Sequence, residues 1–279
     1  MFVGTFAILC LLPFILMVSS SFTSERIVME KGFWFWPRGF TTFSYRILFE
    51  NPAQIVGAYI VTMSLTAVGT AVGLFFVSMT GYALQRPDFL WRNKIAFYIY
   101  FTTLFSGGLV PFYILITKHL QLRDNYLAVL LPLMLSPWLI ILMKNFTKSI
   151  PHSITESAKI DGAGDFTIFI QLILPLSKPA LATIGLFIAL EYWNEWYNSM
   201  LFLSSNVKYR PLQLFLYNAV TMADFIRNSS ASSNIPPQDV PAETMKMATA
   251  VLATGPVILF YPFVQKYFIK GITIGAVKG

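Results

Sequence analysis

One apolar stretch of this chain carries polar side chains that could do chemistry. It reads LEYWNEWYNS and places Glu191, Asn194, Glu195 and Asn198 in a run, residues 179–203, that is otherwise largely apolar. Glu191 and Glu195 are four residues apart, so a continuous helix would put both carboxylates on one face, with the two amides beside them. An ionisable side chain at membrane depth costs free energy unless it faces water or a partner. We therefore take these polar residues as part of a solute path by default.

Three interpretations of this stretch compete. Carboxylates and amides bind hydroxyl groups, and Trp193 and Trp196 could stack on sugar rings, which favours a carbohydrate path. A glutamate could instead carry a proton in a secondary transporter. An interfacial aromatic belt would explain the aromatic rings but not two glutamates on one face. We therefore predict a substrate path that comprises Glu191, Tyr192, Trp193, Asn194, Glu195 and Asn198.

Enzymatic chemistry has no visible basis in the sequence. His119 and His152 lie in different expected loops on opposite sides of the membrane, so they cannot share a metal ion. The phosphate-binding pattern G-x-x-x-x-G-K-[ST] does not occur, so this chain cannot itself cradle ATP. We expect no catalytic residue, no metal site and no cofactor in this chain, and any ATP-driven role requires a separate ATPase subunit.

The composition is that of an integral membrane protein. The chain has 279 residues, of which 56% are hydrophobic and only 12% charged, which is too apolar for a soluble domain. Its net charge of +7 comes from lysines and arginines scattered singly between apolar runs, as membrane-flanking anchors are. We expect membrane lipid, and no nucleic acid, as a partner.

Six nearly uncharged runs are long enough to cross a bilayer, which takes about 20 helical residues. They comprise residues 2–20, 55–84, 95–117, 125–143, 179–203 and 247–265. We therefore predict an all-α membrane protein with six transmembrane helices and both termini on the same side of the membrane. The distribution of lysines and arginines only mildly favours the cytoplasm as that side. Small residues in the second run, including Gly69 and Gly81, favour burial within a helix bundle.

The stretch from 149 to 179 is neither apolar enough to span a bilayer nor polar enough for a simple loop. Ser153 stands three residues before Glu156, the spacing of a capping box, and this predicts a short helix that runs to Ile160. Gly162 and Gly164 provide the backbone freedom for a tight turn, and Asp165 can cap a second helix. The expected apolar face of that second helix comprises Phe166, Phe169, Ile170, Ile173 and Leu174, before Pro175 interrupts it.

The register of this stretch resembles the EAA cytoplasmic loop of permease subunits in binding-protein-dependent ABC importers. The resemblance rests on Glu156-Ser157-Ala158, Asp161-Gly162-Ala163, Leu174-Pro175-Leu176 and Lys178-Pro179, and Ser157 departs from the family's usual alanine. It is closest to the maltose-type carbohydrate permeases, in the branch for complex oligosaccharides, and it covers nearly the whole chain. It implies a type I importer permease whose ATPase-coupling residues are Ser153, Glu156, Ser157, Ala158, Asp161, Gly162, Ala163 and Gly164.

The same resemblance implies an assembly in the bacterial cytoplasmic membrane. Its expected members are a homologous second permease subunit, two ABC ATPase subunits that hold ATP and magnesium, and an extracytoplasmic solute-binding protein. The expected function is the import of a carbohydrate by alternating access, and the expected carbohydrate is an oligosaccharide. A proton-coupled secondary transporter that uses Glu191 or Glu195 stays open as the alternative, although no internal inverted repeat is visible.

We expect a single permease domain over residues 1–279, with the coupling loop at 149–179. Two further segments complete this organisation. Residues 204–246 have the composition of a flexible extracytoplasmic connection. Within it, Tyr209, Arg210 and Gln213 resemble the family's segment for binding-protein contact, with a short interfacial helix as the alternative. The resemblance also implies a cytoplasmic tail, residues 266–279, whose contacts with the ATPases would include Gly275, Lys278 and Gly279.

Overall fold

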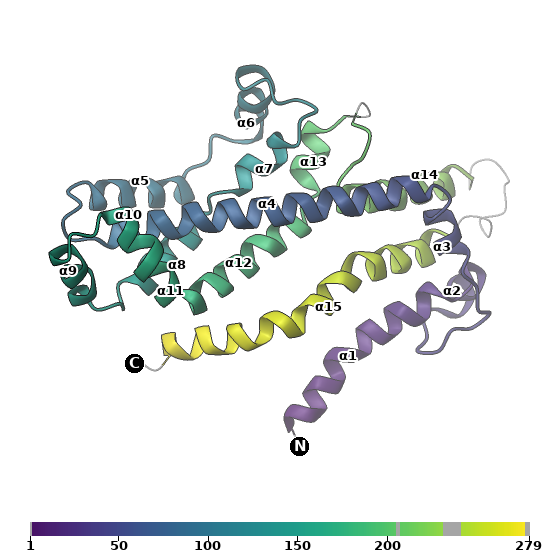
Figure 1. The fold of residues 1–279 in the computed structure, drawn as a ribbon. Helices are drawn as coiled ribbons and strands as arrows, with labels where there is room; N and C mark the ends of the chain where they lie inside the picture. Colours follow the sequence, from purple (N-terminus) through teal and green to yellow (C-terminus); the bar gives the residue numbers. More distant parts are fainter. Residues whose placement is uncertain (1, 205–206, 231–240, 277–279) are drawn as a thin grey trace. The chain divides into compact units, whose positions relative to one another are not determined.

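The structure is a computed structural model that describes residues 2–204, 207–230 and 241–276. Every regular element in these residues is a helix (Figure 1). The chain divides into two compact units, one of residues 1–61 with 209–261 and the other of residues 62–208 with 262–279. Two long helices, α4 (Pro52–Gln85) and α15 (Ala242–Ala276), contribute residues to both units.

The first unit is organised around the beginning of α15. Its other complete helices are α1 (Phe2–Ser21), α2 (Glu25–Lys31), α3 (Phe43–Leu48) and α14 (Leu212–Ser230). The buried carboxylate of Glu25 accepts hydrogen bonds from the backbone N–H groups of Glu243 and Thr244, at 2.9 Å each. These N–H groups have no partner within the helix, so Glu25 stabilises the start of α15 from a distant part of the chain.

The second unit contains the remaining helices. They are α5 (Arg92–Leu104), α6 (Leu109–Ile114), η1 (Leu115–His119), α7 (Leu127–Leu133), α8 (Pro137–Thr147), α9 (His152–Ile160), α10 (Asp165–Ile168), η2 (Phe169–Ile173), α11 (Leu174–Leu176), α12 (Lys178–Trp193) and α13 (Tyr197–Phe202). One core cluster contains Ile116, Ala128 and Phe202, and it holds η1 against α7 and α13. A second cluster, with Tyr82 and Phe169 at its centre, packs η2 against the end of α4.

The apolar runs are helical as predicted, but several of them are broken. Among the described residues, α1 and α4 are each long and apolar enough to cross a membrane, and the number of such spans reaches up to 5 if each bent helix pair is one span. The bends are 114° between α5 and α6–η1, 43° between α7 and α8, and 86° between α10–α11 and α12. At the first bend Gly108 has φ +88°, a conformation that favours glycine and that no helix contains. The sixth run, residues 247–265, lies within α15.

The prediction of a flexible connection over residues 204–246 is wrong for much of this segment. Helix α14 occupies Leu212–Ser230, because apolar residues recur there at helical spacing and bury Leu212, Leu216 and Ala223. Residues 231–240, which carry most of the serine-rich and proline-rich sequence, lie outside the described residues. The expected tail beginning at residue 266 is also helical as far as Ala276, because α15 continues through it.

Two glycines of α4 allow neighbouring helices to approach closely, as the small residues of this run predicted. A Cβ atom on Gly69 would overlap the ring of Tyr192 on α12. On Gly81 it would lie 2.8 Å from Cβ of Met143 and 2.9 Å from the backbone nitrogen of Lys144, both on α8. Because a backbone atom is one of these neighbours, α8 cannot relieve the overlap by a side-chain rotation alone.

We predict that Gly81→Ala destabilises the protein although alanine favours helices. Overpacking a tight contact costs about 1–3 kcal/mol, whereas the gain in helix propensity is about 0.5–1 kcal/mol. Gly255→Ala in α15 is the matched control, because nothing lies within 4 Å of the added Cβ atom. Thermal unfolding in detergent should show a lower transition temperature for Gly81→Ala and an unchanged or higher one for Gly255→Ala. Equal transition temperatures would contradict the close contact.

Candidate functional site

The first part of the candidate site is a helical hairpin over residues 149–177, whose first arm is α9. The predicted short helix is present and ends at Ile160, but the predicted capping box is wrong. Pro151 occupies the N-cap position, so Ser153 lies inside the first turn and makes no capping hydrogen bond. The carboxylate of Glu156 instead lies 2.9 Å from Nδ1 of His152, one turn earlier. With the N-cap at Pro151, Glu156 no longer stands at the third helical position, and proline has neither a hydroxyl nor an N–H group, so this motif cannot form here.

The turn of the hairpin is a Schellman motif. The N–H of Gly162 donates to the carbonyl of Lys159 at 3.0 Å, and the N–H of Ala163 donates to the carbonyl of Ala158 at 2.9 Å. Gly162 has φ +79°, so the predicted need for glycine in this turn is confirmed. Ala158 and Ala163 are partly buried and both pack against the Tyr82–Phe169 cluster, and this contact seats the turn on the rest of the unit.

The second arm differs from the prediction at its start and in its buried face. Gly164, not Asp165, occupies the N-cap position of α10, and the carboxylate of Asp165 pairs with Arg86. Residues 169–173 form the π-helical segment η2, whose wider turn shifts the face that packs inward. Ile168 is consequently buried, whereas the side chain of Phe166 is 62% exposed although it was predicted on the apolar face.

Much of the hairpin is open to solvent in the chain by itself. The predicted coupling residues that are exposed are Ser153, Glu156, Ser157, Asp161, Gly162 and Gly164. Ile160, the last residue of α9, has 86% of its surface exposed.

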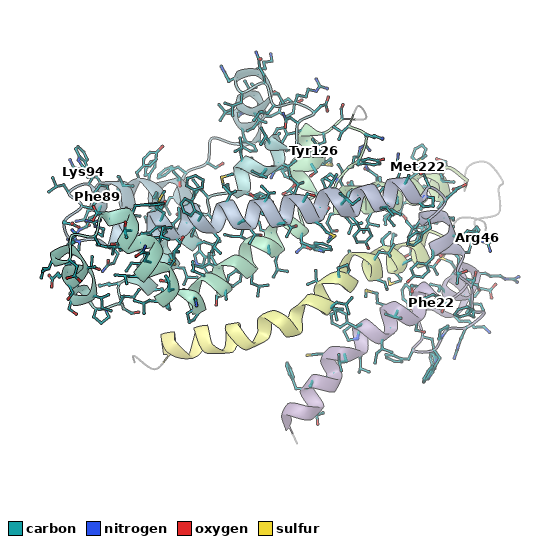
Figure 2. All side chains as sticks on the ribbon, in the orientation of Figure 1. Phe22, Arg46, Phe89, Lys94, Tyr126 and Met222 are labelled. Atoms are coloured by element: carbon teal, nitrogen blue, oxygen red, sulfur yellow. The ribbon has the colours of Figure 1, made fainter. Side chains whose placement is uncertain are left out.

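Four charged residues meet where the hairpin adjoins the end of α4. The guanidinium of Arg86 contacts the carboxylate of Asp88, and its Nη1 lies 2.6 Å from Oδ1 of Asp165. Nζ of Lys159 lies 2.7 Å from Oδ2 of Asp88. We call these four residues the Arg86 cluster. Figure 2 labels Phe89, which follows Asp88, at the same end of the unit as α9 and α10.

The charges of the Arg86 cluster reinforce one another. Hydrogen bonds from Arg86 and then from Lys159 hold the pKa of Asp88 well below its usual value, and the Asp88 carboxylate raises the pKa of Arg86. Arg86 and Asp88 therefore stay charged at physiological pH. Sequence analysis missed the cluster: the alternating charges of Arg86 and Asp88 suggest a local pair, but no pattern links them to residues more than 70 positions later.

The second part of the candidate site is the stretch from Glu191 to Asn198, and its predicted geometry is wrong. Helix α12 ends at Trp193, Asn194 is its C-cap, and α13 begins at Tyr197. Glu191 and Glu195 are therefore not on one face of a continuous helix. Oε1 of Glu195 accepts hydrogen bonds from the N–H groups of Asn198 at 2.5 Å and Ser199 at 3.2 Å, so this carboxylate caps the start of α13.

The aromatic residues of this stretch divide into packed and exposed rings. Tyr192 is buried and its hydroxyl donates to the carbonyl of Leu130 at 2.6 Å. Trp193 is only 9% exposed, so its ring is not available for stacking in this conformation. Trp196, in the break between α12 and α13, is 38% exposed. Glu191 and Asn194 are also exposed.

The remaining predicted residues lie at the edges of the described chain. Tyr209, Arg210 and Gln213 are partly buried at the start of α14, and the ring of Tyr209 packs over Gly57 of α4. Gly275 lies in the last turn of α15, and Lys278 and Gly279 lie outside the described residues.

Comparisons with known proteins agree on one kind of relative. The family described as "Binding-protein-dependent transport system inner membrane component" matches residues 79–274. The polygalacturonan/rhamnogalacturonan transport system permease protein YtcP of Bacillus subtilis is 41% identical over 100% of this chain and 96% of its own length. The arabinooligosaccharides transport system permease protein AraQ of the same organism is 31% identical over 85% of this chain and 78% of its own.

A solved structure is similar over nearly the full length. It is the crystal structure of a bacterial ABC transporter involved in the import of the acidic polysaccharide alginate, with a TM-score of 0.79 and 31% identity. The match covers 96% of this chain and 94% of that chain. The fold described above is therefore shared with an importer subunit of known structure.

We predict that substitutions of Gly162 act through backbone conformation alone. No atom lies within 4 Å of a Cβ atom added there, so the cost comes from φ +79°, which β-branched residues resist most and asparagine least. Gly162→Val should therefore impair activity of the assembled complex more than Gly162→Ala, and Gly162→Asn should impair it least. Gly164→Val is the control, because Gly164 is extended, with φ −71°, and has equal space. Equal activity of the three Gly162 variants would show that the turn tolerates any residue.

Proposed function

This chain belongs to the family of binding-protein-dependent transport system inner membrane components, and we propose that it is a transmembrane subunit of an ATP-dependent carbohydrate importer. One observation carries the proposal: the family match includes the whole hairpin, and the hairpin exposes Glu156 while its turn is seated on the core. A surface of this kind suits a separate ATPase that drives transport from outside this chain.

The proposed assembly contains a homologous second permease subunit, two ABC ATPase subunits and an extracytoplasmic solute-binding protein in the bacterial cytoplasmic membrane. The family description supports the binding protein and the inner membrane. ATP and magnesium would be bound by the ATPase subunits. The proposed contact residues outside the hairpin are Tyr209, Arg210 and Gln213 for the binding protein and Gly275, Lys278 and Gly279 for the ATPases.

The proposed substrate is an oligosaccharide. The printed names of the relatives support this class, since they describe transport of polygalacturonan or rhamnogalacturonan and of arabinooligosaccharides. In this chain the exposed carboxylate of Glu191 and the neighbouring polar side chain of Asn194 offer groups that bind sugar hydroxyls. The exposed ring of Trp196 offers a stacking surface close by.

The proposed mechanism is alternating access driven through the hairpin. Closure of the ATPases on ATP would displace α9, and the helices packed against the hairpin would rock to open the path outward. The proton-coupled alternative would use Glu191 or Glu195 as the proton carrier, and the carboxylate of Glu195 instead caps the start of α13. Nothing in the comparisons supports the alternative.

We predict that Glu156→Lys abolishes ATP-driven uptake while the complex still assembles, because we expect the surface of the ATPase that receives α9 to be basic and to repel the reversed charge. The measurement is sugar uptake and ATP hydrolysis by the complex in vesicles. Glu50→Lys, which reverses another exposed carboxylate outside the hairpin, is the control and should behave as wild type. Uptake driven by a pH gradient without ATP in the wild-type complex would overturn the proposed function.

We further predict that Trp193, the last residue of α12, and Trp196, in the break that follows, respond differently to substitution by alanine. Trp193→Ala should lower stability by about 3–5 kcal/mol because the ring is buried. Trp196→Ala should leave the unfolding temperature nearly unchanged but weaken uptake, since loss of a stacked ring removes about 1 kcal/mol, roughly a fivefold rise in KM. Unfolding curves and uptake kinetics of both variants decide this. An unchanged KM for Trp196→Ala would remove this residue from the path.

A further inference from the structure

The Arg86 cluster joins three elements that are distant in the sequence. Arg86 and Asp88 follow the last turn of α4, Lys159 lies in the last turn of α9, and Asp165 is the first residue of α10. The cluster therefore ties both arms of the hairpin to the end of α4. Nη1 of Arg92, at the start of α5, donates to the carbonyl of Arg86 at 3.1 Å and extends the connection to the next helix.

Arg86 occupies the centre of the cluster. Its side chain is only 14% exposed and lies over the ring of Tyr82, with 5.9 Å between Cζ and the ring centroid. The guanidinium is a planar fork, so it can hold Asp88 and Asp165 at the same time, which a single ammonium group does poorly. A partly buried, networked pair of this kind fixes geometry better than an isolated surface ion pair.

A second contact beneath the cluster has a different character. Tyr82 of α4 stacks on Phe169 of η2 with 5.8 Å between ring centroids, in a cluster that also contains Ile168 and Ile173. Apolar contact holds the hairpin against α4, but it is non-directional and permits sliding. The ion pairs are directional, because each one requires a particular position of the hairpin along α4.

We infer that the Arg86 cluster is the linkage that transmits movement of the hairpin to α4. This inference rests on the proposed function and adds the residues that carry the coupling inside this chain. When an ATPase displaces α9, Lys159 and Asp165 move with the hairpin, and Arg86 and Asp88 draw the end of α4 with them. Without the cluster the hairpin would slide on its apolar contact, and ATP would be hydrolysed with less transport. Arg86, Asp88, Lys159 and Asp165 are thus positioning residues that contact no substrate.

The test measures the number of sugar molecules imported per ATP hydrolysed by the complete complex in vesicles. The variants are Arg86→Gln, Asp165→Asn and the double variant, with Asp165→Glu as the conservative one that keeps the charge. We expect the ratio to fall roughly tenfold in each single variant, within the range of typical coupling energies. The double variant should lose less than the two single losses combined, because both substitutions remove the Arg86–Asp165 ion pair. Asp165→Glu should keep most of the ratio.

The control is Lys148→Gln, which removes an exposed positive charge just before the hairpin. It should leave the ratio unchanged. Should Arg86→Gln prevent assembly, Lys159→Gln tests the same linkage, because it removes the ion pairs of Lys159 with Asp88 and Asp165 without touching the partly buried guanidinium. A roughly twofold lower ratio is expected there, since these more exposed ion pairs contribute less than those of the guanidinium. A merely structural role would lower the amount of complex but not the ratio.

Two results would overturn the inference: a wild-type ratio in the assembled variants, or losses in Arg86→Gln and Asp165→Asn that add up in the double variant. The proposed function is judged separately, on ATP-driven uptake by the wild-type complex. A wild-type complex that imports sugar beside variants with unchanged ratios would leave the function in place and remove only the linkage.

Discussion

The structure depends above all on the need to satisfy backbone hydrogen bonds where lipid offers no partner. Helices meet this need within each segment, and the described residues of this chain are built from them. The cost appears wherever a helix stops, because its terminal N–H and carbonyl groups lose their partners. This chain has several such breaks inside or beside its apolar runs, and the placement of many polar side chains follows from them.

Polar residues at the breaks act first as replacements for lost backbone partners. Glu195 accepts the N–H groups at the start of α13, Glu25 does the same for α15, and Asp124 accepts the N–H of Ser204 at 2.6 Å. A carboxylate in an apolar run can therefore have a structural reason to be there. The side chains that remain available to bind a sugar are those that do not cap a helix end, such as the exposed Glu191.

The hairpin over residues 149–177 shows the same principle. Its turn is closed by its own Schellman hydrogen bonds, so Glu156 and Ser157 need not serve the backbone and remain exposed. Its other side is held by rings and by the Arg86 cluster. A rigid turn with one packed side and one exposed side can move as a unit, and the proposed coupling to a separate ATPase requires such a movement.

The sequence by itself determined the helical membrane class, the approximate apolar runs, the hairpin and the glycine in its turn. These follow from composition and from local steric rules that act over a few residues. Tertiary structure alone decided where the helices break, that Glu195 caps α13 instead of facing Glu191, and that Ser153 caps nothing. It also decided that Arg86 meets Asp165. The physical reason is that helix ends and ion pairs depend on which distant groups fold close together, and single-sequence spacing carries no record of that.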